Sequence, residues 1–343
     1  MIKPKNYPCN PHKSVKSANT ALVGCGYWGK NLVRVFHKLG VLKIICDKDK
    51  KILEARKKEY PGLQVTTNFD RILKDKEIKG IVIATPAATH YKLTKQSLLA
   101  GKDVFVEKPL ALKVKEGKEL VKIAKKKKLI LMVGHLLLYH PAMVKLEEII
   151  KKGELGDIRY IWSNRLNFGK LRREENVLWS FAPHDISVII DILGIPERVI
   201  AMGKSYLQQN IPDVTLSFLE FRNRRAAHIF VSWLNPFKEQ KLSVIGSEAM
   251  AVFDDQAKNK LIVYHHKVVW QKDKNPEAMR AKGEIINIPE KEPLVEEAKH
   301  FLECVKKRKT PRTDGKEALD VLKVLDACQK SLDHNGKITN VCE

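Results

Sequence analysis

The hexapeptide Gly24-Cys25-Gly26-Tyr27-Trp28-Gly29 has the composition and spacing of a phosphate-binding loop. Gly24 would make the tight turn out of a strand, Gly26 would let the backbone approach a pyrophosphate, and Gly29 would let a helix pack closely on the strand. An apolar run precedes the loop and an amphipathic run follows it, so the first amides of the helix would face the ligand. The loop, with Cys25, Tyr27 and Trp28, predicts dinucleotide binding; the alternative is a turn that merely needs glycines.

Asp47 lies 23 positions beyond Gly24, at the end of the next expected strand. A carboxylate there would accept hydrogen bonds from both hydroxyls of the adenosine ribose and would repel a 2′-phosphate. The position favours NAD over NADP, although Lys48 and Lys50 weaken the preference. An alternative role, as N-cap of a helix that begins near Asp49, is compatible with either cofactor.

A second turn, Ala84-Thr85-Pro86-Ala87-Ala88-Thr89-His90, follows another apolar strand. Proline fixes the turn, and Thr89 is the expected N-cap of the next helix. The turn should border the nicotinamide half of the cofactor, so Ala84, Thr85, Pro86 and His90 join the predicted cofactor contacts. A histidine on the helix surface is the alternative for His90.

The tripeptide Glu107-Lys108-Pro109 ends a further strand, so Lys108 should project into the same crevice. Glu107 and Lys108 therefore join the predicted cofactor contacts. Pro109 holds the preceding backbone extended and permits a cis bond. The ammonium of Lys108 could hydrogen-bond a substrate hydroxyl and stabilise the alkoxide that loses a hydride. Lys108 is therefore a candidate catalytic residue, and the alternative is one more surface lysine.

Proton removal needs a group that titrates near neutrality, and His184 is the best candidate. Pro183 is expected at a helix start, which would place His184 in the first turn, facing the crevice. The alternative is a capped histidine in the core.

The preceding segment, Asn164 to Asn176, is rich in groups that bind hydroxyls and phosphates, and it supplies Arg165, Asn167, Arg172 and Asn176 as candidate substrate contacts. For each of them the alternative is a solvated charged loop.

The elements that must position these residues alternate between short apolar strands and amphipathic helices from Asn19 to Leu136. This alternation predicts an α/β fold with a doubly wound parallel sheet, whose ligand crevice lies at the carboxyl ends of the strands. The expected strands are 21–23, 42–46, 81–84, 104–106 and 130–133, and the expected helices are 30–39, 49–59, 89–100 and 113–127.

Beyond Pro141 the pattern changes, and from Arg198 to Tyr264 strand patterns follow one another without helices between them. This run predicts a C-terminal α+β domain with a large open, mostly antiparallel sheet. We expect a flexible basic tail at 1–18, a dinucleotide-binding domain at 19–136, a substrate and oligomerisation domain at 137–332 and a C-terminal tail at 333–343. The expected strands are 158–168, 198–206, 213–221, 226–233, 241–245, 249–253 and 260–264, and the expected helices are 142–151, 183–193, 293–308 and 314–331.

Composition and charge limit which partners, cell compartment and cysteine chemistry we expect. The 343 residues carry a net charge of +23. The excess is mostly lysine without interleaved aromatics, which favours a solvated surface or steering of an anionic substrate over nucleic-acid binding. No run reaches the length of a membrane span, and residues 1–18 lack the pattern of a signal peptide. The six cysteines have no metal-ligand or redox spacing. We expect a cytoplasmic protein with reduced thiols, no resident metal and no membrane partner.

These motifs resemble the glucose-fructose oxidoreductase, inositol dehydrogenase and MocA (Gfo/Idh/MocA) family of nicotinamide-dependent oxidoreductases over about residues 19–332. The resemblance is carried by Val23 to Gly29, Ala84-Thr85-Pro86 with His90, Glu107-Lys108-Pro109, Gly134 to Pro141, and His184-Asp185. It implies that Lys108 is catalytic, that His184 assists proton transfer, and that the second sheet supports a homo-oligomer, a dimer or tetramer. Many members carry an aspartate four positions before the catalytic histidine, where this chain has Ser180, so Ser180 or Asp185 would take a supporting role.

Several stretches are similar to a subgroup of the family that oxidises the 3-hydroxyl of UDP-N-acetylglucosamine to a ketone for a partner aminotransferase. They are His135 to Pro141, Asn164 to Asn176, Trp179 to Ser187 and Trp233 to Lys238. The likeness adds Tyr139, His140, Ser180, Trp233 and Lys238 to the substrate contacts.

The sequence therefore predicts an NAD-dependent sugar-nucleotide 3-dehydrogenase. Dehydrogenation of another UDP- or dTDP-sugar, or of a free cyclitol such as myo-inositol, is the alternative within the family. A redox-sensing or nucleic-acid-binding protein that keeps the fold without chemistry is the alternative from another class.

Overall fold

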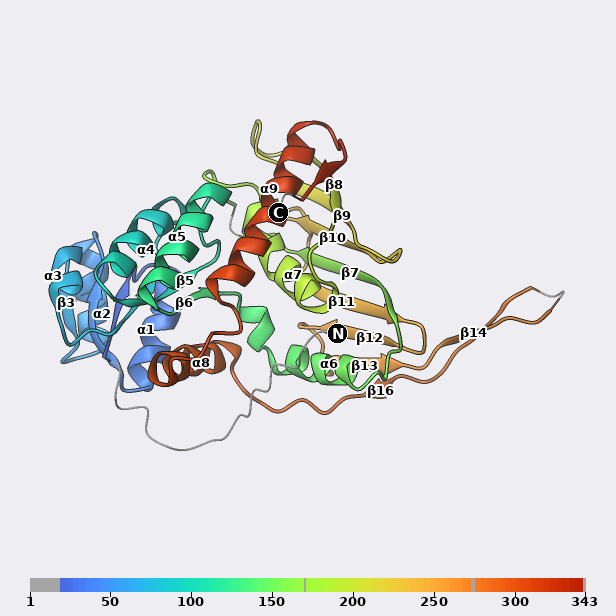
Figure 1. Ribbon diagram of the computed structural model, residues 1–343, viewed down its shortest axis with the longest axis horizontal. Helices are drawn as coiled ribbons and strands as arrows, with labels where there is room; N and C mark the ends of the chain where they lie inside the picture. Colours follow the sequence, from blue (N-terminus) through green and yellow to red (C-terminus); the bar gives the residue numbers. More distant parts are fainter. Residues whose placement is uncertain (1–18, 170, 273–274, 342–343) are drawn as a thin grey trace.

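The computed structural model describes residues 19–169, 171–272 and 275–341, which form two large sheets with helices packed around and between them, and one two-stranded sheet (Figure 1). The predicted basic tail at 1–18 lies outside the described residues, as do Cys9 and Cys342. The other four cysteines, Cys25, Cys46, Cys304 and Cys328, are buried free thiols, which confirms that prediction for them.

The first sheet is parallel and six-stranded, in the order β3-β2-β1-β4-β5-β6. Every residue of β1, β4 and β5 is buried and most are aliphatic, as expected for a sheet covered on both faces. The sequence analysis missed only β3 and the short α3. The elements are β1 (Thr20–Val23), α1 (Gly29–Lys38), β2 (Leu42–Cys46), α2 (Lys50–Glu59), β3 (Gln64–Thr66), α3 (Phe69–Lys74), β4 (Gly80–Ile83), α4 (His90–Leu99), β5 (Asp103–Glu107), α5 (Val114–Lys127) and β6 (Leu131–Gly134).

The strand order reverses between β1 and β4, and this switch point places the three predicted motifs at one edge. Val23 at the end of β1 pairs with Ile83 at the end of β4, and Ile83 pairs with Val106 of β5. The glycine loop, the Ala84 turn and Lys108 each follow one of these strands. The doubly wound architecture and the shared crevice edge are therefore confirmed.

The second sheet has nine strands in the order β16-β13-β12-β11-β7-β10-β9-β8-β17 and is antiparallel except for β7 beside β10. The predicted open, mostly antiparallel sheet is confirmed, and α7 and α9 lie between it and the first sheet (Figure 1). Its elements are β7 (Ile158–Leu166), β8 (Arg198–Lys204), β9 (Val214–Glu220), β10 (Ala226–Ser232), β11 (Glu239–Gly246), β12 (Met250–Asp254), β13 (Leu261–Tyr264), β16 (Glu284–Ile285) and β17 (Thr339–Asn340), with α6 (Pro141–Lys151), α7 (Val177–Leu193), α8 (Pro293–Lys307) and α9 (Gly315–Asp333).

Two further pieces of structure lie in stretches where we predicted no strand or helix. A hairpin of β14 (Lys267–Val269) and β15 (Glu277–Met279) projects from the body of the molecule (Figure 1). The edge strand β17 pairs with β8 inside the stretch predicted as a C-terminal tail.

Helix α7 differs from its predicted bounds in a way that matters for the site. We expected it to begin at Pro183, but it begins at Val177, and Pro183 lies inside it. Asn176 is the N-cap, since its side-chain oxygen accepts from the amide of Trp179 at 3.2 Å. The prediction failed because proline, although favoured at helix starts, is tolerated inside a helix whose other contacts compensate for the lost bond.

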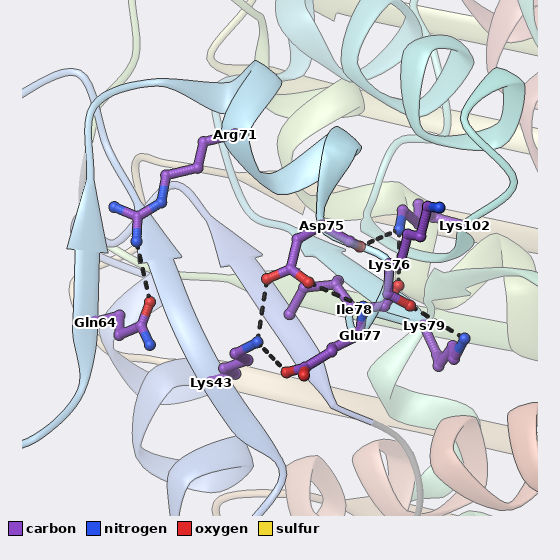
Figure 2. Close-up of polar contacts among 9 residues, drawn as sticks. All are labelled: Lys43, Gln64, Arg71, Asp75, Lys76, Glu77, Ile78, Lys79 and Lys102. Atoms are coloured by element: carbon purple, nitrogen blue, oxygen red, sulfur yellow. Dashed lines mark hydrogen bonds and ion pairs between the residues drawn. The ribbon is translucent and has the colours of Figure 1, made fainter.

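A lysine cluster at the amino-terminal edge of the first sheet ties the α3–β4 loop to neighbouring strands (Figure 2). The buried Lys102 donates to the backbone oxygens of Asp75 and Ile78 at 2.5 and 2.9 Å, and burial lowers its pKa. Lys43 of β2 pairs with the carboxylates of Asp75 and Glu77. Part of the large lysine excess thus fixes local structure rather than serving a ligand.

Helix α8 returns from the end of the chain to cover the first sheet. Phe301 is fully buried, and its ring lies edge-on to Phe36 of α1 and Phe105 of β5 at centroid distances of 6.4 and 5.8 Å. The predicted domain boundary at residue 136 remains a prediction. That boundary assigns α8 to the second domain, but α8 packs in the core of the first. None of the helices in the described ranges is long and apolar enough to cross a bilayer.

We predict that Phe301→Ala lowers the free energy of unfolding by about 3–5 kcal/mol, because it leaves a cavity among three rings. Chemical denaturation measures the change. Leu99→Ala, at a half-exposed position on α4, is the matched control and should change stability by less than about 0.5 kcal/mol. Equal effects of the two substitutions would show that α8 does not depend on this packing.

Candidate active site

The glycine loop has the geometry of a phosphate cradle. Gly24 has a φ of +89°, and a Cβ on Gly29 would lie 1.9 Å from the carbonyl oxygen of Gly24, so neither position accepts a side chain. A Cβ on Gly26 would meet nothing within 4 Å, which leaves open space above the loop. Trp28, the N-cap of α1, makes no side-chain capping bond, and the amides of Lys30 and Asn31 donate to the carbonyls of Gly26 and Trp28 at 3.1 and 2.9 Å. An anion at the loop would therefore be stabilised by the positive end of the helix dipole.

Asp47 holds the loop from the end of β2. One carboxylate oxygen accepts from the amide of Cys25 at 2.7 Å and the other from the amide of Asp49 at 3.0 Å. Asp49 itself caps α2, which excludes the alternative role of Asp47 as N-cap. Because each carboxylate oxygen can accept a second hydrogen bond, Asp47 retains capacity for ribose hydroxyls.

Trp28 joins the glycine loop to the end of β5. Its indole Nε1 donates to a carboxylate oxygen of Glu107 at 2.6 Å, and a Cβ on Gly134 would lie 3.0 Å from the other oxygen. Burial raises the pKa of Glu107, while the Trp28 hydrogen bond and the charge of Lys108 act in the opposite direction. Glu107 is thus a packed, hydrogen-bonded partner of the loop, whereas the ring of Tyr27 is 71% exposed.

His90 is buried and links the other two crevice loops. Its Nδ1 lies 2.7 Å from the carbonyl oxygen of Pro109 and its Nε2 lies 2.8 Å from that of Thr85. The alternative of a helix-surface histidine is therefore wrong. Thr89 is the N-cap of α4, as predicted, but its side chain makes no capping bond, because its hydroxyl bonds to the hydroxyl of Thr85 and to the backbone oxygen of Pro86. Burial lowers the pKa of His90.

Lys108 follows β5 and reaches the first turn of α7. Its Nζ donates to the carbonyl oxygen of Ser180 at 2.6 Å, and the Lys108–Pro109 peptide bond is cis. Burial lowers the pKa of Lys108, and the charge of Glu175 is the strongest influence that raises it. The amine thus lies between the two domains, where the sequence analysis placed it.

His184 lies in the interior of α7, not in its first turn. Burial lowers its pKa well below the usual range, and the charges of Lys108, Arg165 and His135 add to that effect. Its Nδ1 is buried without a hydrogen-bond partner among the described residues. A neutral imidazole with an unused nitrogen beside an ammonium is suited to accept a proton from a ligand.

Two residues that the sequence analysis did not select stand behind His184. His135, after β6, is buried, and its Nδ1 lies 2.7 and 3.0 Å from the two carboxylate oxygens of Glu317 in α9. Burial raises the pKa of Glu317, and His135 opposes the shift. A backbone bond of 2.9 Å from Val133 to Thr313 ties the start of α9 to β6. Only the fold brings residue 317 near residue 135, so no local pattern could have revealed the pair.

Arg165 is committed to a protein partner. Its Nε and Nη2 donate to the two carboxylate oxygens of Asp185 at 2.7 and 3.1 Å, and Ser163 donates to the same carboxylate at 2.7 Å. Arg165 and Asp185 are both buried, so this pair fixes β7 against α7. Asp185 accordingly supports the site through Arg165.

A cavity of about 290 Å³ opens beside the first turn of α7. Asn176 donates through Nδ2 to the side-chain oxygen of Gln329 at 2.8 Å, and the indole of Trp179 donates to the same oxygen at 2.9 Å. The cavity is lined by Leu112, Arg173, Glu174, Glu175, Asn176, Trp179, Asn210, Ile211 and Gln329. Gln329 and Asn210 were missed by the sequence analysis, because neither belongs to a recognisable motif.

The remaining candidate substrate residues do not line this cavity. Tyr139 is buried with its hydroxyl 3.1 Å from that of Thr313, and Trp233 is fully buried. His140 caps α6 through a 3.1 Å bond from Ala142. Lys238 is exposed on the β10–β11 connection. The backbone amide of Asn167 donates to the backbone carbonyl of Ser232 at 3.0 Å. Arg172 pairs through Nε with Glu175 at 3.1 Å, beside the cavity.

The residues at the crevice edge fit a dinucleotide. The open space above the glycine loop, the positive end of the α1 dipole and Asp47 meet the requirements of a pyrophosphate and a ribose. No group of three or more His, Cys, Asp or Glu side chains placed to hold a metal ion occurs within the described ranges.

Fold and site together define a dinucleotide-dependent oxidoreductase. Residues 18–135 match the model of the oxidoreductase family with an NAD-binding Rossmann fold, and residues 143–252 match the Gfo/Idh/MocA C-terminal domain. The chain belongs to the Gfo/Idh/MocA family, and its first domain is an NAD-binding domain.

Characterised proteins similar to this chain include sugar and cyclitol enzymes. UDP-N-acetylglucosamine 3-dehydrogenase of Acidithiobacillus ferrooxidans is 22% identical over 86% of this chain and 91% of its own. Its structure superposes with a TM-score of 0.81 over 92% of this chain and 97% of its own, at 21% identity. The NADP(+)-dependent scyllo-inositol 2-dehydrogenase IolW of Bacillus subtilis is 26% identical over 55% of either chain. GenD2 from gentamicin A biosynthesis, solved with NAD, gives a TM-score of 0.83 over 99% of this chain and 100% of its own, at 22% identity.

We predict that Gly26→Ala weakens NAD binding at least about tenfold without lowering the melting temperature of the free protein. The added methyl group meets no protein atom, but it occupies the space through which the backbone must approach the pyrophosphate. Isothermal titration calorimetry measures the affinity. Gly24→Ala is the contrast, because it collides with Ala84 and should destabilise the fold itself. Unchanged NAD affinity in Gly26→Ala would contradict the assignment of the loop.

Proposed function

We propose that this protein is an NAD-dependent dehydrogenase that oxidises the 3-hydroxyl of a sugar nucleotide, UDP-N-acetylglucosamine in the first instance, to a ketone. The proposal rests mainly on one observation: Lys108 donates to the Ser180 carbonyl of α7 at 2.6 Å, and His184, four residues further along the same helix, has a buried Nδ1 without a hydrogen-bond partner among the described residues. These are the two groups that oxidation of a carbinol needs.

The chemistry divides between the two side chains. Lys108 donates a hydrogen bond to the sugar hydroxyl and stabilises the negative charge that develops on its oxygen. His184 takes the hydroxyl proton at Nδ1. NAD held by the glycine loop and Asp47 would supply the hydride acceptor for the sugar carbon. The C–O bond then becomes a carbonyl, and the product carries two hydrogens fewer than the sugar.

The polar cavity beside α7 supports a sugar as the substrate class. Amide side chains of Asn176, Asn210 and Gln329 suit hydroxyls, and Trp179 offers an aromatic face. Arg172 and Arg173 next to it suit a diphosphate. The similarity to UDP-N-acetylglucosamine 3-dehydrogenase over 86% of the chain supports the sugar nucleotide, and a transaminase that consumes the ketone would be the pathway partner.

A free cyclitol is the second candidate, supported by the similarity to scyllo-inositol 2-dehydrogenase. The two candidates differ in the role of the nucleotide. Reduction of NAD is followed with UDP-N-acetylglucosamine, other UDP- and dTDP-sugars, myo-inositol and scyllo-inositol, with transaminase and glutamate added to remove the ketone. Turnover of a sugar nucleotide with inhibition by UDP supports our proposal. Turnover of a free cyclitol that UDP does not inhibit selects the second candidate.

We also propose a homo-oligomer that forms through the outer face of the nine-stranded sheet. Met202 and Leu216, paired neighbours on β8 and β9, are 60% and 49% exposed there. Apolar side chains of this size in adjacent strands suit contact with another copy of the chain.

We predict that Lys108→Ala lowers kcat at least about 100-fold while NAD affinity stays within about twofold, since Lys108 acts on the substrate oxygen. Steady-state kinetics and calorimetry measure the two quantities. Lys92→Ala, at an exposed position on α4, is the control and should behave like the wild type. Near-normal turnover in Lys108→Ala would refute the catalytic assignment.

We predict an acidic limb in the pH profile of kcat/KM with its midpoint below pH ~6.5, the ordinary value for histidine. His184 must be neutral to accept the proton, and burial lowers its pKa, so activity persists above that lowered pKa and is lost as the pH falls through it. His184→Gln should lower activity and remove this limb, whereas His334→Gln, at an exposed position, should leave it in place. A limb that survives in His184→Gln would assign it to another group.

A further inference from the structure

One glutamine of α9 holds the first turn of α7. The side-chain oxygen of Gln329 accepts from the indole Nε1 of Trp179 at 2.9 Å and from the Nδ2 of Asn176 at 2.8 Å. Its Nε2 donates to Oδ1 of Asp333, one turn further along α9, at 2.7 Å. The two donors use both lone pairs of the amide oxygen, so Gln329 is oriented from both ends.

These contacts hold the indole of Trp179 in one orientation at the 290 Å³ cavity. Trp179 also packs against the hydrophobic core, and its backbone amide donates to the side-chain oxygen of Asn176 at 3.2 Å. A tryptophan that is packed against the core and tied through its N–H has little freedom to turn. It therefore presents a fixed aromatic surface to a ligand in the cavity.

The cavity lies close to Lys108. Ser180, whose carbonyl accepts from Lys108 at 2.6 Å, directly follows Trp179, and Leu112, four residues after Lys108, lines the cavity. Its volume of about 290 Å³ is at the lower limit of the ~300–1,000 Å³ that ligand pockets span, so it has room for one ring and not for a whole sugar nucleotide. The ring nearest to Lys108 is the one on which that lysine acts.

The lining of the cavity combines apolar and amide side chains. Leu112, Ile211 and Trp179 are apolar, whereas Asn176 and Asn210 carry amides. A saturated sugar or cyclitol ring has an apolar face of C–H groups and a rim of hydroxyls. Such a ring therefore matches both kinds of side chain, the first by contact with the aromatic and aliphatic groups and the second by hydrogen bonds.

We propose that the indole of Trp179 is the platform on which the apolar face of the substrate ring packs, and that Gln329 is a positioning residue that holds this platform. The inference rests on the proposed function, because it places the same ring between Trp179 and Lys108. Gln329 acts through its acceptor oxygen. Without that oxygen the indole N–H loses its partner, and the ring of Trp179 can turn away from the ligand.

Fluorine NMR tests the platform without turnover. The full-length protein is labelled with 5-fluorotryptophan at its five tryptophans, and the Trp179 resonance is identified by its loss in Trp179→Phe. NADH is present, so that no hydride leaves the ligand. UDP-N-acetylglucosamine should shift this resonance, and UDP should leave it in place. An equal shift with UDP would place the nucleotide base on the indole and overturn the proposal, as would the absence of a shift with UDP-N-acetylglucosamine, UDP and myo-inositol alike.

Substitutions at Gln329 test the positioning role. Gln329→Leu and Trp179→Ala should each weaken binding of the probe that shifts the resonance about tenfold, because the fixed aromatic contact is lost in both. Gln329→Glu combined with Asp333→Asn keeps an acceptor for both α7 donors and reverses the bond to position 333, so it should restore the affinity. Gln256→Leu, at an exposed glutamine between β12 and β13, is the matched control and should bind like the wild type. Full affinity in Gln329→Leu, or no rescue by the double variant, would overturn the role of Gln329.

The platform and the proposed function fail on different results. If the resonance responds to myo-inositol and not to UDP-N-acetylglucosamine, the sugar nucleotide of the proposed function is wrong, while the platform stands for a cyclitol ring. If UDP-N-acetylglucosamine reduces NAD but neither shifts the resonance nor binds more weakly to Trp179→Ala, the proposed function stands and the platform is wrong.

Discussion

The contact between the Lys108 ammonium and the carbonyl of Ser180 is the interaction on which the site depends, because it is where the two domains meet chemically. Lys108 belongs to the end of a strand in the NAD-binding sheet, and Ser180 to a helix that packs on the second sheet. A partly buried amine needs such a partner, since an unpaired charge away from water is costly. Ser180 lies four residues before His184 on the same helix, and the charge of Lys108 contributes to the lowered pKa of His184. The packing of the domains and the chemistry of the crevice therefore depend on the same contact.

Around this contact the chain uses its own residues to hold each loop in place. His90 ties the turn after β4 to Pro109, and Trp28 ties the glycine loop to Glu107. Behind His184, His135 and Glu317 connect the end of β6 with the start of α9. The crevice is therefore framed by side chains from both domains that bind one another, and the groups left for ligands are the loop amides, Asp47, the amine and the imidazole.

Much of the site could be predicted from the sequence because its parts lie at strand ends with local signatures. The glycine loop, the Ala84 turn and Lys108 each follow an apolar run, and parallel pairing brings such ends to one edge. Long-range partners could not be predicted. Gln329, Glu317 and Asn210 reach the site only through folding, and Arg165 was expected to bind substrate although the fold gives it to Asp185. The start of α7 was misplaced because Pro183 was taken as a boundary, while the capping signal was Asn176.

The most direct measurement of the central claim is a crystal structure of the protein with NAD and UDP-N-acetylglucosamine bound. Our account predicts that the Lys108 amine lies within hydrogen-bond distance of the sugar 3-hydroxyl, with His184 on the same oxygen and the carbinol carbon facing the nicotinamide. A structure in which the Lys108 side chain points to bulk solvent, or in which the sugar lies away from the crevice, would contradict it.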